Sequence, residues 1–134
     1  MPDYLLNMGR QLLRNPQWAD IEAAIRQLGI SPEINTVLLQ APDEELPWLT
    51  VGGTCDDRYY LSVELRPAET FVLVDRDAPD DYVEVSFPFG EWDMMPMSHL
   101  IGLDKVLMAA EHYFKFCATH PQLTWEKHGS GLKG

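Results

Sequence analysis

The sequence predicts an α+β fold, in which an antiparallel, meander-like sheet of about five or six strands packs against two main helices. Strand-like runs follow one another at residues 58–65, 70–74 and 82–87, and short turns rich in Asp and Pro separate them. Two other segments, one before these runs and one after them, repeat apolar residues at helical spacing. Runs joined by short turns become antiparallel neighbours, and the apolar stripes of the helices must lie on the sheet.

The N-terminal part of the chain predicts one helix. The pattern leaves the secondary structure of residues 1–14 open, because their apolar side chains favour packing against the body of the protein while Gly9 weakens a helical interpretation. The helix follows, with Asn15 as its N-cap and Pro16 at its first position. Its apolar stripe advances in steps of three, four and three residues before Gly29 ends the helix, and consists of Trp18, Ile21, Ile25 and Leu28.

Two strands are predicted between this helix and the three runs. Residues 34–40 are rich in leucine and β-branched side chains, which favours a strand, and residues 41–45 form an exposed acidic turn. Residues 47–51 form a second strand that ends at Gly52 and Gly53. A turn at residues 55–57 then joins this strand to the next run as a hairpin.

Alternation predicts which side chains the helices cover. In the three runs the covered face consists of Tyr60, Val63, Leu65, Phe71, Leu73, Val83, Val85 and Phe87. The second helix spans residues 103–117, and its stripe consists of Leu103, Val106, Leu107, Ala110, Tyr113, Phe114 and Cys117. After it, residues 122–126 return as a short strand, and residues 127–134 form a flexible tail.

Length and composition predict one soluble domain. A chain of 134 residues with 46% hydrophobic residues can bury its own core, so residues 1–134 form a single domain. Cys55 and Cys117 are expected to be reduced thiols rather than a disulfide. The N-terminus lacks the basic start and apolar run of a secretion signal, and no run approaches the roughly 20 apolar residues of a membrane span. We therefore expect a cytoplasmic protein that does not enter a membrane.

The negative charge is concentrated in one part of the sequence. The net charge is −11, and the segment between Asp43 and Asp93 holds 14 acidic and three basic residues, so that this segment alone carries −11. Such a surface repels nucleic acid and anionic membranes, whereas it attracts a basic protein and accelerates its association. The alternative is that the acidity serves solubility alone. Both interpretations stay open on composition.

The motifs that would bind a metal or a phosphate are incomplete. Asp75, Asp77 and Asp80 are spaced like the start of a calcium loop, but Pro79 occupies a ligand position, and the turn glycine and the closing Glu are missing. The segment Gly52-Gly53-Thr54 lacks the continuation of a phosphate-binding loop and precedes two aspartates. We expect no metal site and no phosphate site here.

The residues that would support catalysis show no recognisable arrangement either. The four histidines lack metal-ligand spacing, and His112 is expected to face solvent. Cys117 lies on an apolar stripe, where core packing is favoured over a role as nucleophile. We expect no cofactor and no enzymatic activity, although a site assembled from distant residues would leave no local motif.

A family resemblance covers most of the chain, from about Trp18 to Trp125. It rests on the helix at residues 15–28 followed by a strand, the run Leu49-Thr-Val-Gly-Gly53, the strand meander, the helix with Ala109-Ala110 and Tyr113-Phe114, and the closing Leu123-Thr-Trp125. In this order of features the chain resembles the Imm1 family of bacterial immunity proteins, which are encoded beside polymorphic toxins. The resemblance implies an α+β protein that binds and blocks a toxin, often a nucleic-acid deaminase, and that carries no catalytic residues.

These observations lead to one main functional hypothesis. We expect a cytoplasmic immunity protein whose acidic surface occludes the active site of a cognate toxin. The candidate toxins are nucleic-acid deaminases and nucleases, which are expected to have a basic cleft. The carboxylates expected to contact the toxin are Asp56, Asp57, Asp75, Asp77, Asp80 and Asp81. Within the irregular segment 88–97, an apolar anchor is expected from Trp92, Met94 or Met95, unless these side chains plug the end of the sheet instead.

Two alternatives remain at this point. An acidic secretion chaperone would also bind one protein client, and it predicts a homodimer that holds an extended client segment. A small-molecule enzyme on an α+β scaffold is the second alternative. The sequence leaves the oligomeric state open, with a monomer favoured, and no nucleic-acid partner is expected.

Overall fold

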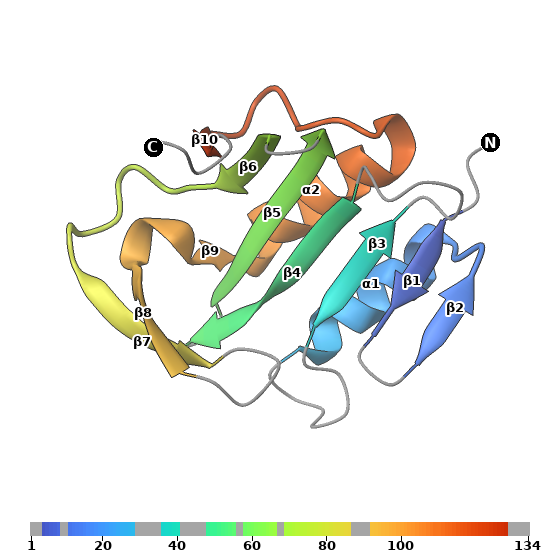
Figure 1. Ribbon diagram of the computed structural model, residues 1–134, viewed down its shortest axis with the longest axis horizontal. Helices are drawn as coiled ribbons and strands as arrows, with labels where there is room; N and C mark the ends of the chain where they lie inside the picture. Colours follow the sequence, from blue (N-terminus) through green and yellow to red (C-terminus); the bar gives the residue numbers. More distant parts are fainter. Residues whose placement is uncertain are drawn as a thin grey trace.

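The computed structural model of the chain describes residues 4–8, 11–28, 36–40, 48–55, 58–66, 69–86 and 92–128. Within these ranges the chain forms an α+β fold of helices and antiparallel strands (Figure 1). The helices are α1 (Trp18–Gln27), α2 (Leu103–Phe116) and the short 3-10 helix η1 (Met97–His99). The strands are β1 (Leu5–Asn7), β2 (Leu12–Arg14), β3 (Val37–Gln40), β4 (Trp48–Cys55), β5 (Arg58–Arg66), β6 (Glu69–Leu73), β7 (Tyr82–Ser86), β8 (Trp92–Pro96), β9 (Ile101–Gly102) and β10 (Trp125–His128).

The main sheet has the strand order β10-β6-β5-β4-β3-β1-β2. Strands β3 to β6 are consecutive antiparallel neighbours, which confirms the predicted meander. The predicted C-terminal strand is present as β10 and pairs with β6. The structure holds more strands than predicted, because β1 and β2 form in the N-terminal segment, β8 forms in the segment predicted to be irregular, and β9 precedes α2. The strand predicted at residues 47–51 does not end at Gly52 and Gly53 as expected, since it is β4 and continues to Cys55 across a shift in register.

Both helices cover the same face of this sheet (Figure 1). Partners in neighbouring strands share a face, so the register that aligns Leu39 with Leu49 and Leu49 with Val63 lines up one buried row. This row packs with Ile25 of α1 and Tyr113 of α2 in the main core, where all five side chains are fully buried. The predicted stripe of the second helix is confirmed by this packing.

The β7–β8 hairpin leaves the main sheet and forms a second, smaller core. In the described part of the chain, β7 pairs with β4 at one position, Thr54 with Ser86, and pairs with β8 along its whole length. Val85 packs there with Met95 and Leu100, and the partly buried Tyr60 lies against them. The prediction that Tyr60, Val83 and Val85 lie beneath the helices is therefore wrong. In β5 the helix side carries Tyr59, Leu61 and Val63.

The start of the first helix also differs from the prediction. Helix α1 begins at Trp18, and the Asp20 carboxylate accepts a hydrogen bond from the backbone N–H of Gln17, with a distance of 2.8 Å between nitrogen and Oδ2. Asn15 lies outside the helix with a φ of 52°, and its N–H donates to the carbonyl of Tyr4 at 2.9 Å. Pro16 is buried between them. The N–H of Asn15 thus extends the pairing of β1 with β2, which a local pattern does not predict, and the helix starts two residues later than expected.

The C-terminal part of the chain closes the fold around α2. Cys117 caps the helix in the left-handed conformation, with a φ of 55°, and carries a free thiol. The final strand begins at Trp125 rather than at residue 122, and includes Lys127, which the prediction assigned to the tail. The Trp125 indole N–H donates to the carbonyl of His120 at 2.9 Å, which fixes the turn between helix and strand. Across the described residues, neither α-helix has the length and apolar character needed to cross a membrane.

Candidate protein-binding surface

A short acidic segment, residues 75–81, connects β6 to β7 and is called here the acidic turn. Its backbone is closed by hydrogen bonds from the Ala78 N–H to the Asp75 carbonyl at 3.2 Å and from the Asp81 N–H to the Pro79 carbonyl at 2.9 Å. Both ends are tied to η1: the Asp75 N–H donates to the Ser98 carbonyl at 2.7 Å, and the Met97 N–H donates to the Asp81 carbonyl at 2.9 Å. The acidic turn is therefore preorganised rather than left to order upon binding.

The carboxylates of the acidic turn have two different roles. Asp75 is half-buried, and its Oδ1 accepts the N–H of Asp77 at 3.0 Å, which shapes the turn. Asp81 is exposed, and its Oδ1 accepts the N–H of Tyr82 at 3.0 Å. Asp77 and Asp80 are exposed and make no ion pair or side-chain hydrogen bond within the described part of the chain. Asp77, Asp80 and Asp81 can therefore attract a cationic partner.

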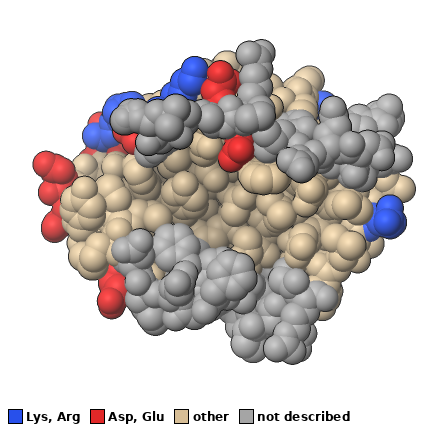
Figure 2. Space-filling view, in the orientation of Figure 1, with Lys and Arg blue, Asp and Glu red and all other residues tan. Residues whose placement is uncertain are grey.

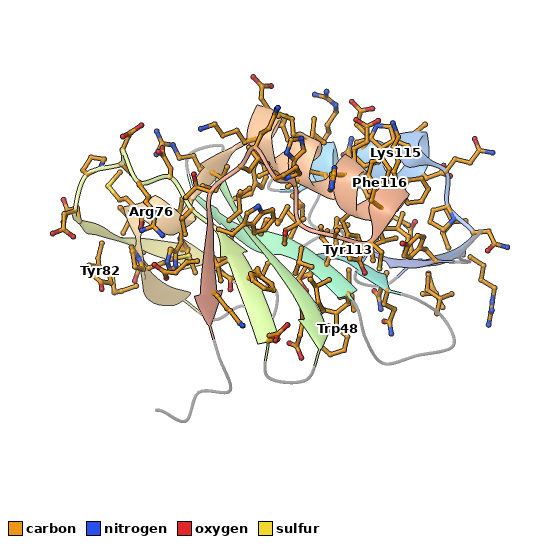
Figure 3. All side chains as sticks on the ribbon, turned by 90° about the horizontal axis from the view of Figure 1, so that it is seen from above. Trp48, Arg76, Tyr82, Tyr113, Lys115 and Phe116 are labelled. Atoms are coloured by element: carbon orange, nitrogen blue, oxygen red, sulfur yellow. The ribbon has the colours of Figure 1, made fainter. Side chains whose placement is uncertain are left out.

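Apolar side chains lie beside these carboxylates on the outer face of the β7–β8 hairpin. Tyr82 is 58% exposed and Met94 is 56% exposed. Register places Met94 opposite Glu84 and Tyr82 opposite Pro96, so these side chains belong to one face. Tyr82 and Arg76 lie at the same end of the molecule in Figure 3. An exposed aromatic ring next to unpaired carboxylates combines the two components of a protein-binding surface.

A hollow of about 360 Å³ separates the acidic turn from β10. Its charged lining residues are Arg76, Asp80, Asp81 and Glu126. Glu126 Oε1 lies 3.3 Å from Nε2 of His99, so this carboxylate already has a side-chain neighbour. The hollow is open and carries both charge signs, which suits contact with a protein side chain better than enclosure of a small molecule.

The structure brings together only part of the predicted site. Asp75, Asp77, Asp80 and Asp81 form one cluster, whereas Asp56 and Asp57 lie outside the described residues. Of the predicted anchors, Met94 is exposed, while Met95 is 9% exposed and packs in the second core, as the alternative of a plug expected. The backbone of Trp92 lies in β8, and its side chain lies outside the described part.

Sequence reasoning missed Tyr82 as a surface residue. The run was interpreted through its buried side chains, Val83 and Val85, and alternation from these two places Tyr82 and Glu84 on the opposite face. That signal was present in the sequence. The exposure of this face depends on the hairpin leaving the main sheet, and no local pattern predicts this.

Two further hollows contain titratable groups. One of about 470 Å³ lies at the N-terminus of α2 and is lined by Arg58, Asp75, Asp104 and Lys105 among others. The other, of about 170 Å³, lies on the outer side of α2, where the rings of His112 and His120 are 4.9 Å apart.

The pKa of His112 is lowered, first by desolvation and then by the nearby His120. His112 was expected to face solvent, and it is half-buried against His120 and Phe116. In the described ranges no three His, Cys, Asp or Glu side chains are close enough together to hold a metal ion.

The surroundings of Cys117 fit packing better than nucleophilic chemistry. Burial, followed by the proximity of Cys117, raises the pKa of both Tyr4 and Tyr113 above the ordinary value. These protonated phenols are poor general bases at neutral pH, and a nucleophilic thiolate needs a base or a cation beside it. The thiol, the two rings and Phe114 pack together at the end of α2.

No model of a known protein family matches the chain, and no curated protein matches it. The resemblance to the Imm1 family therefore stays a prediction from the residues that carry it.

Proposed function

We propose that this chain is an immunity protein that binds a toxin domain with a basic surface and blocks its active site. The observation that carries this proposal is the preorganised acidic turn, with exposed Asp77, Asp80 and Asp81, beside the exposed Tyr82 and Met94. The function is binding and occlusion, so it needs neither a cofactor nor a catalytic residue of its own. The protein would act in the cytoplasm, where the toxin finds its target.

The two parts of the surface would make different contributions. Exposed carboxylates raise the rate at which a cationic partner arrives, and salt screens this effect. An aromatic side chain that becomes fully buried contributes more of the affinity and slows dissociation. Tyr82 is suited to the second task, because more than half of its surface is exposed in the free protein.

Charge distribution supports a basic protein over nucleic acid as the partner. Figure 2 shows acidic side chains at the end of the molecule that carries the β7–β8 hairpin. A polyanion would be repelled there, whereas a toxin that handles nucleic acid usually presents a basic cleft. The resemblance to the Imm1 family points to the same class of partner.

Capture and protection together test this function. The tagged protein is used to retain partners from a lysate of its source organism, and the retained protein is then expressed in a susceptible host with and without this chain. We expect one basic partner whose C-terminal domain stops growth unless this chain is co-expressed. A partner that is harmless on its own, or one that still stops growth in the presence of this chain, would contradict the proposal.

One observation favours the chaperone as a second candidate. Strand β2 ends the main sheet, and its Leu12 and Leu13 are 59% and 36% exposed. An edge strand with apolar side chains can pair with an extended client segment or with a second copy. This interpretation requires a homodimer, so a monomer in light scattering coupled to size-exclusion chromatography would contradict it.

A further inference from the structure

The face of the main sheet that points away from both helices forms a second surface, called here the open face. Successive residues of a strand point to opposite faces, and cross-strand partners share a face. Leu49 and Val63 pair on the helix side, so the neighbouring pair Thr50 and Ser62 lies on the open face. Two cross-strand rows define its centre: Leu38, Thr50, Ser62 and Val72 in one, and Trp48, Glu64 and Thr70 in the other. Val72 is buried, and beyond it the first row continues to Glu126 of β10 at the edge of the sheet.

The centre of the open face is almost free of charge, although the chain carries a net charge of −11. Glu64 is the one charged residue among these seven central positions, and its Oε1 accepts a hydrogen bond from the Thr70 hydroxyl at 3.3 Å. Figure 2 shows the result as an uncharged band across this side of the molecule. Surfaces of soluble proteins usually intersperse charged residues of both signs, which oppose association. A need for solubility alone therefore does not explain why the centre of the open face has so few charged residues in such an acidic protein.

Trp48 gives this face an aromatic side chain. Its side chain is half-buried and is not part of either hydrophobic core. In Figure 3 it lies on the side of the sheet opposite Tyr113. Uncharged polar residues around a tryptophan are typical of the centre of a protein interface, where charged residues are depleted and aromatic residues are enriched.

The open face continues into the surface assigned above to the partner. At one end, the inner face of the β7–β8 hairpin packs on Tyr60, which belongs to the open face of β5. The hairpin therefore packs at the Tyr60 end of the open face, and it carries Tyr82 and follows the acidic turn in the chain. In Figure 3, Tyr82 and Trp48 both lie on the side away from the helices.

We infer that the basic partner seats on the open face, with Trp48 at the centre of the contact and the acidic turn at its border. This inference rests on the proposed function, because it gives the footprint of the same partner. Charge selects the occupant: a second copy carries the same −11 and is repelled, whereas a cationic protein is attracted by the carboxylates at the border. The partner surface that fits has an uncharged centre and Lys or Arg on the side that meets the acidic turn.

Two substitutions on the open face test this footprint, with the basic protein that wild type retains from lysate as the probe. Trp48→Ala removes the aromatic contact, and Thr50→Lys places a charge in the uncharged centre. Met108→Lys is the matched control, because Met108 is 42% exposed on α2 and this variant has the same change in charge. Circular dichroism and thermal unfolding confirm that each variant is folded, and titration calorimetry measures its affinity.

We expect Trp48→Ala and Thr50→Lys each to weaken binding by about tenfold or more, and Met108→Lys to leave it within about twofold. The open-face footprint would be overturned if both folded open-face variants bound with wild-type affinity. If neutralising Asp80 and Asp81 still slowed association in that case, the proposed function would stay in place. If wild type retains no basic protein at all, the proposed function fails, and the footprint fails with it.

Discussion

Neighbouring methionines in β8 have opposite environments. Met94 is 56% exposed, whereas Met95 is 9% exposed and packs with Val85 and Leu100. Both were candidate anchors on sequence, because an irregular segment with Pro and Gly gives no alternation from which to assign faces. The pairing of β8 with β7 sets the alternation, so the assignment requires the tertiary structure.

The first prediction concerns these two side chains. Met95→Ala should lower the free energy of unfolding by about 2–4 kcal/mol, because it leaves a cavity in the second core, whereas Met94→Ala should change it by less than about 0.5 kcal/mol. Urea unfolding followed by circular dichroism measures both. Equal losses in the two variants would contradict the assignment of faces.

The second prediction concerns His112. Its pKa is lowered in the folded protein by desolvation and by His120, so the unfolded chain binds more protons below its ordinary pKa of about 6.5. The contribution of His112 to stability is therefore complete above that pH, and it is lost as the pH falls from there through the lowered pKa of the folded protein. Between pH 7.5 and 5.5, the urea midpoint of wild type should fall more than that of His112→Gln.

His112→Gln also serves as the internal control, because every other titrating group, including Glu111 and Lys115 around the same hollow, is retained in it. Identical pH dependence of the two proteins would show that His112 titrates alike in the folded and unfolded chain.

At the scale of elements, local patterns predicted the meander and both helices, but not their ends. The strands β3 to β6 and the stripe of α2 follow from alternation and helical spacing within one segment. The β1–β2 hairpin joins the sheet by pairing with β3, and the β7–β8 hairpin is placed by its pairing with β4 at Thr54 and Ser86. Both are contacts between distant segments, which a local pattern does not encode.

The start of α1 carries the third prediction. Asp20→Ala should lower the free energy of unfolding by about 1 kcal/mol, since it leaves the Gln17 N–H without its carboxylate acceptor and removes a negative charge from the first turn. Gln27→Ala, an exposed change on the same helix, is the control and should cost much less. Thermal unfolding distinguishes them, and equal midpoints would place the cap elsewhere.

At the scale of the whole molecule, charge and apolar surface are segregated. Helices cover one face of the sheet, an uncharged band crosses the other, and the acidic turn stands at one end (Figures 1 and 2). The sequence alone identified the acidic cluster, because carboxylates concentrated in one segment are visible without a structure. The apolar half of the site was predictable only in part, since the exposure of Tyr82 and Trp48 depends on where the hairpin and the helices pack.

Neutralising the acidic turn is the fourth prediction and addresses the charge directly. The Asp80→Asn/Asp81→Asn variant removes two charges, and the amide introduced at position 81 keeps an oxygen that can accept the Tyr82 N–H. The Glu22→Gln/Glu111→Gln control removes two charges from the helix side, where both carboxylates already pair with a cation. If only net charge mattered, the two double variants would behave alike.

The most direct measurement is the association rate of these two variants with the basic partner, by stopped flow from about 50 to 300 mM salt. The account predicts that Asp80→Asn/Asp81→Asn associates at least about threefold more slowly at low salt with a flatter salt dependence, while Glu22→Gln/Glu111→Gln stays close to wild type. Equal association rates for both variants and wild type at every salt concentration would contradict it, and would remove the acidic turn from the interface.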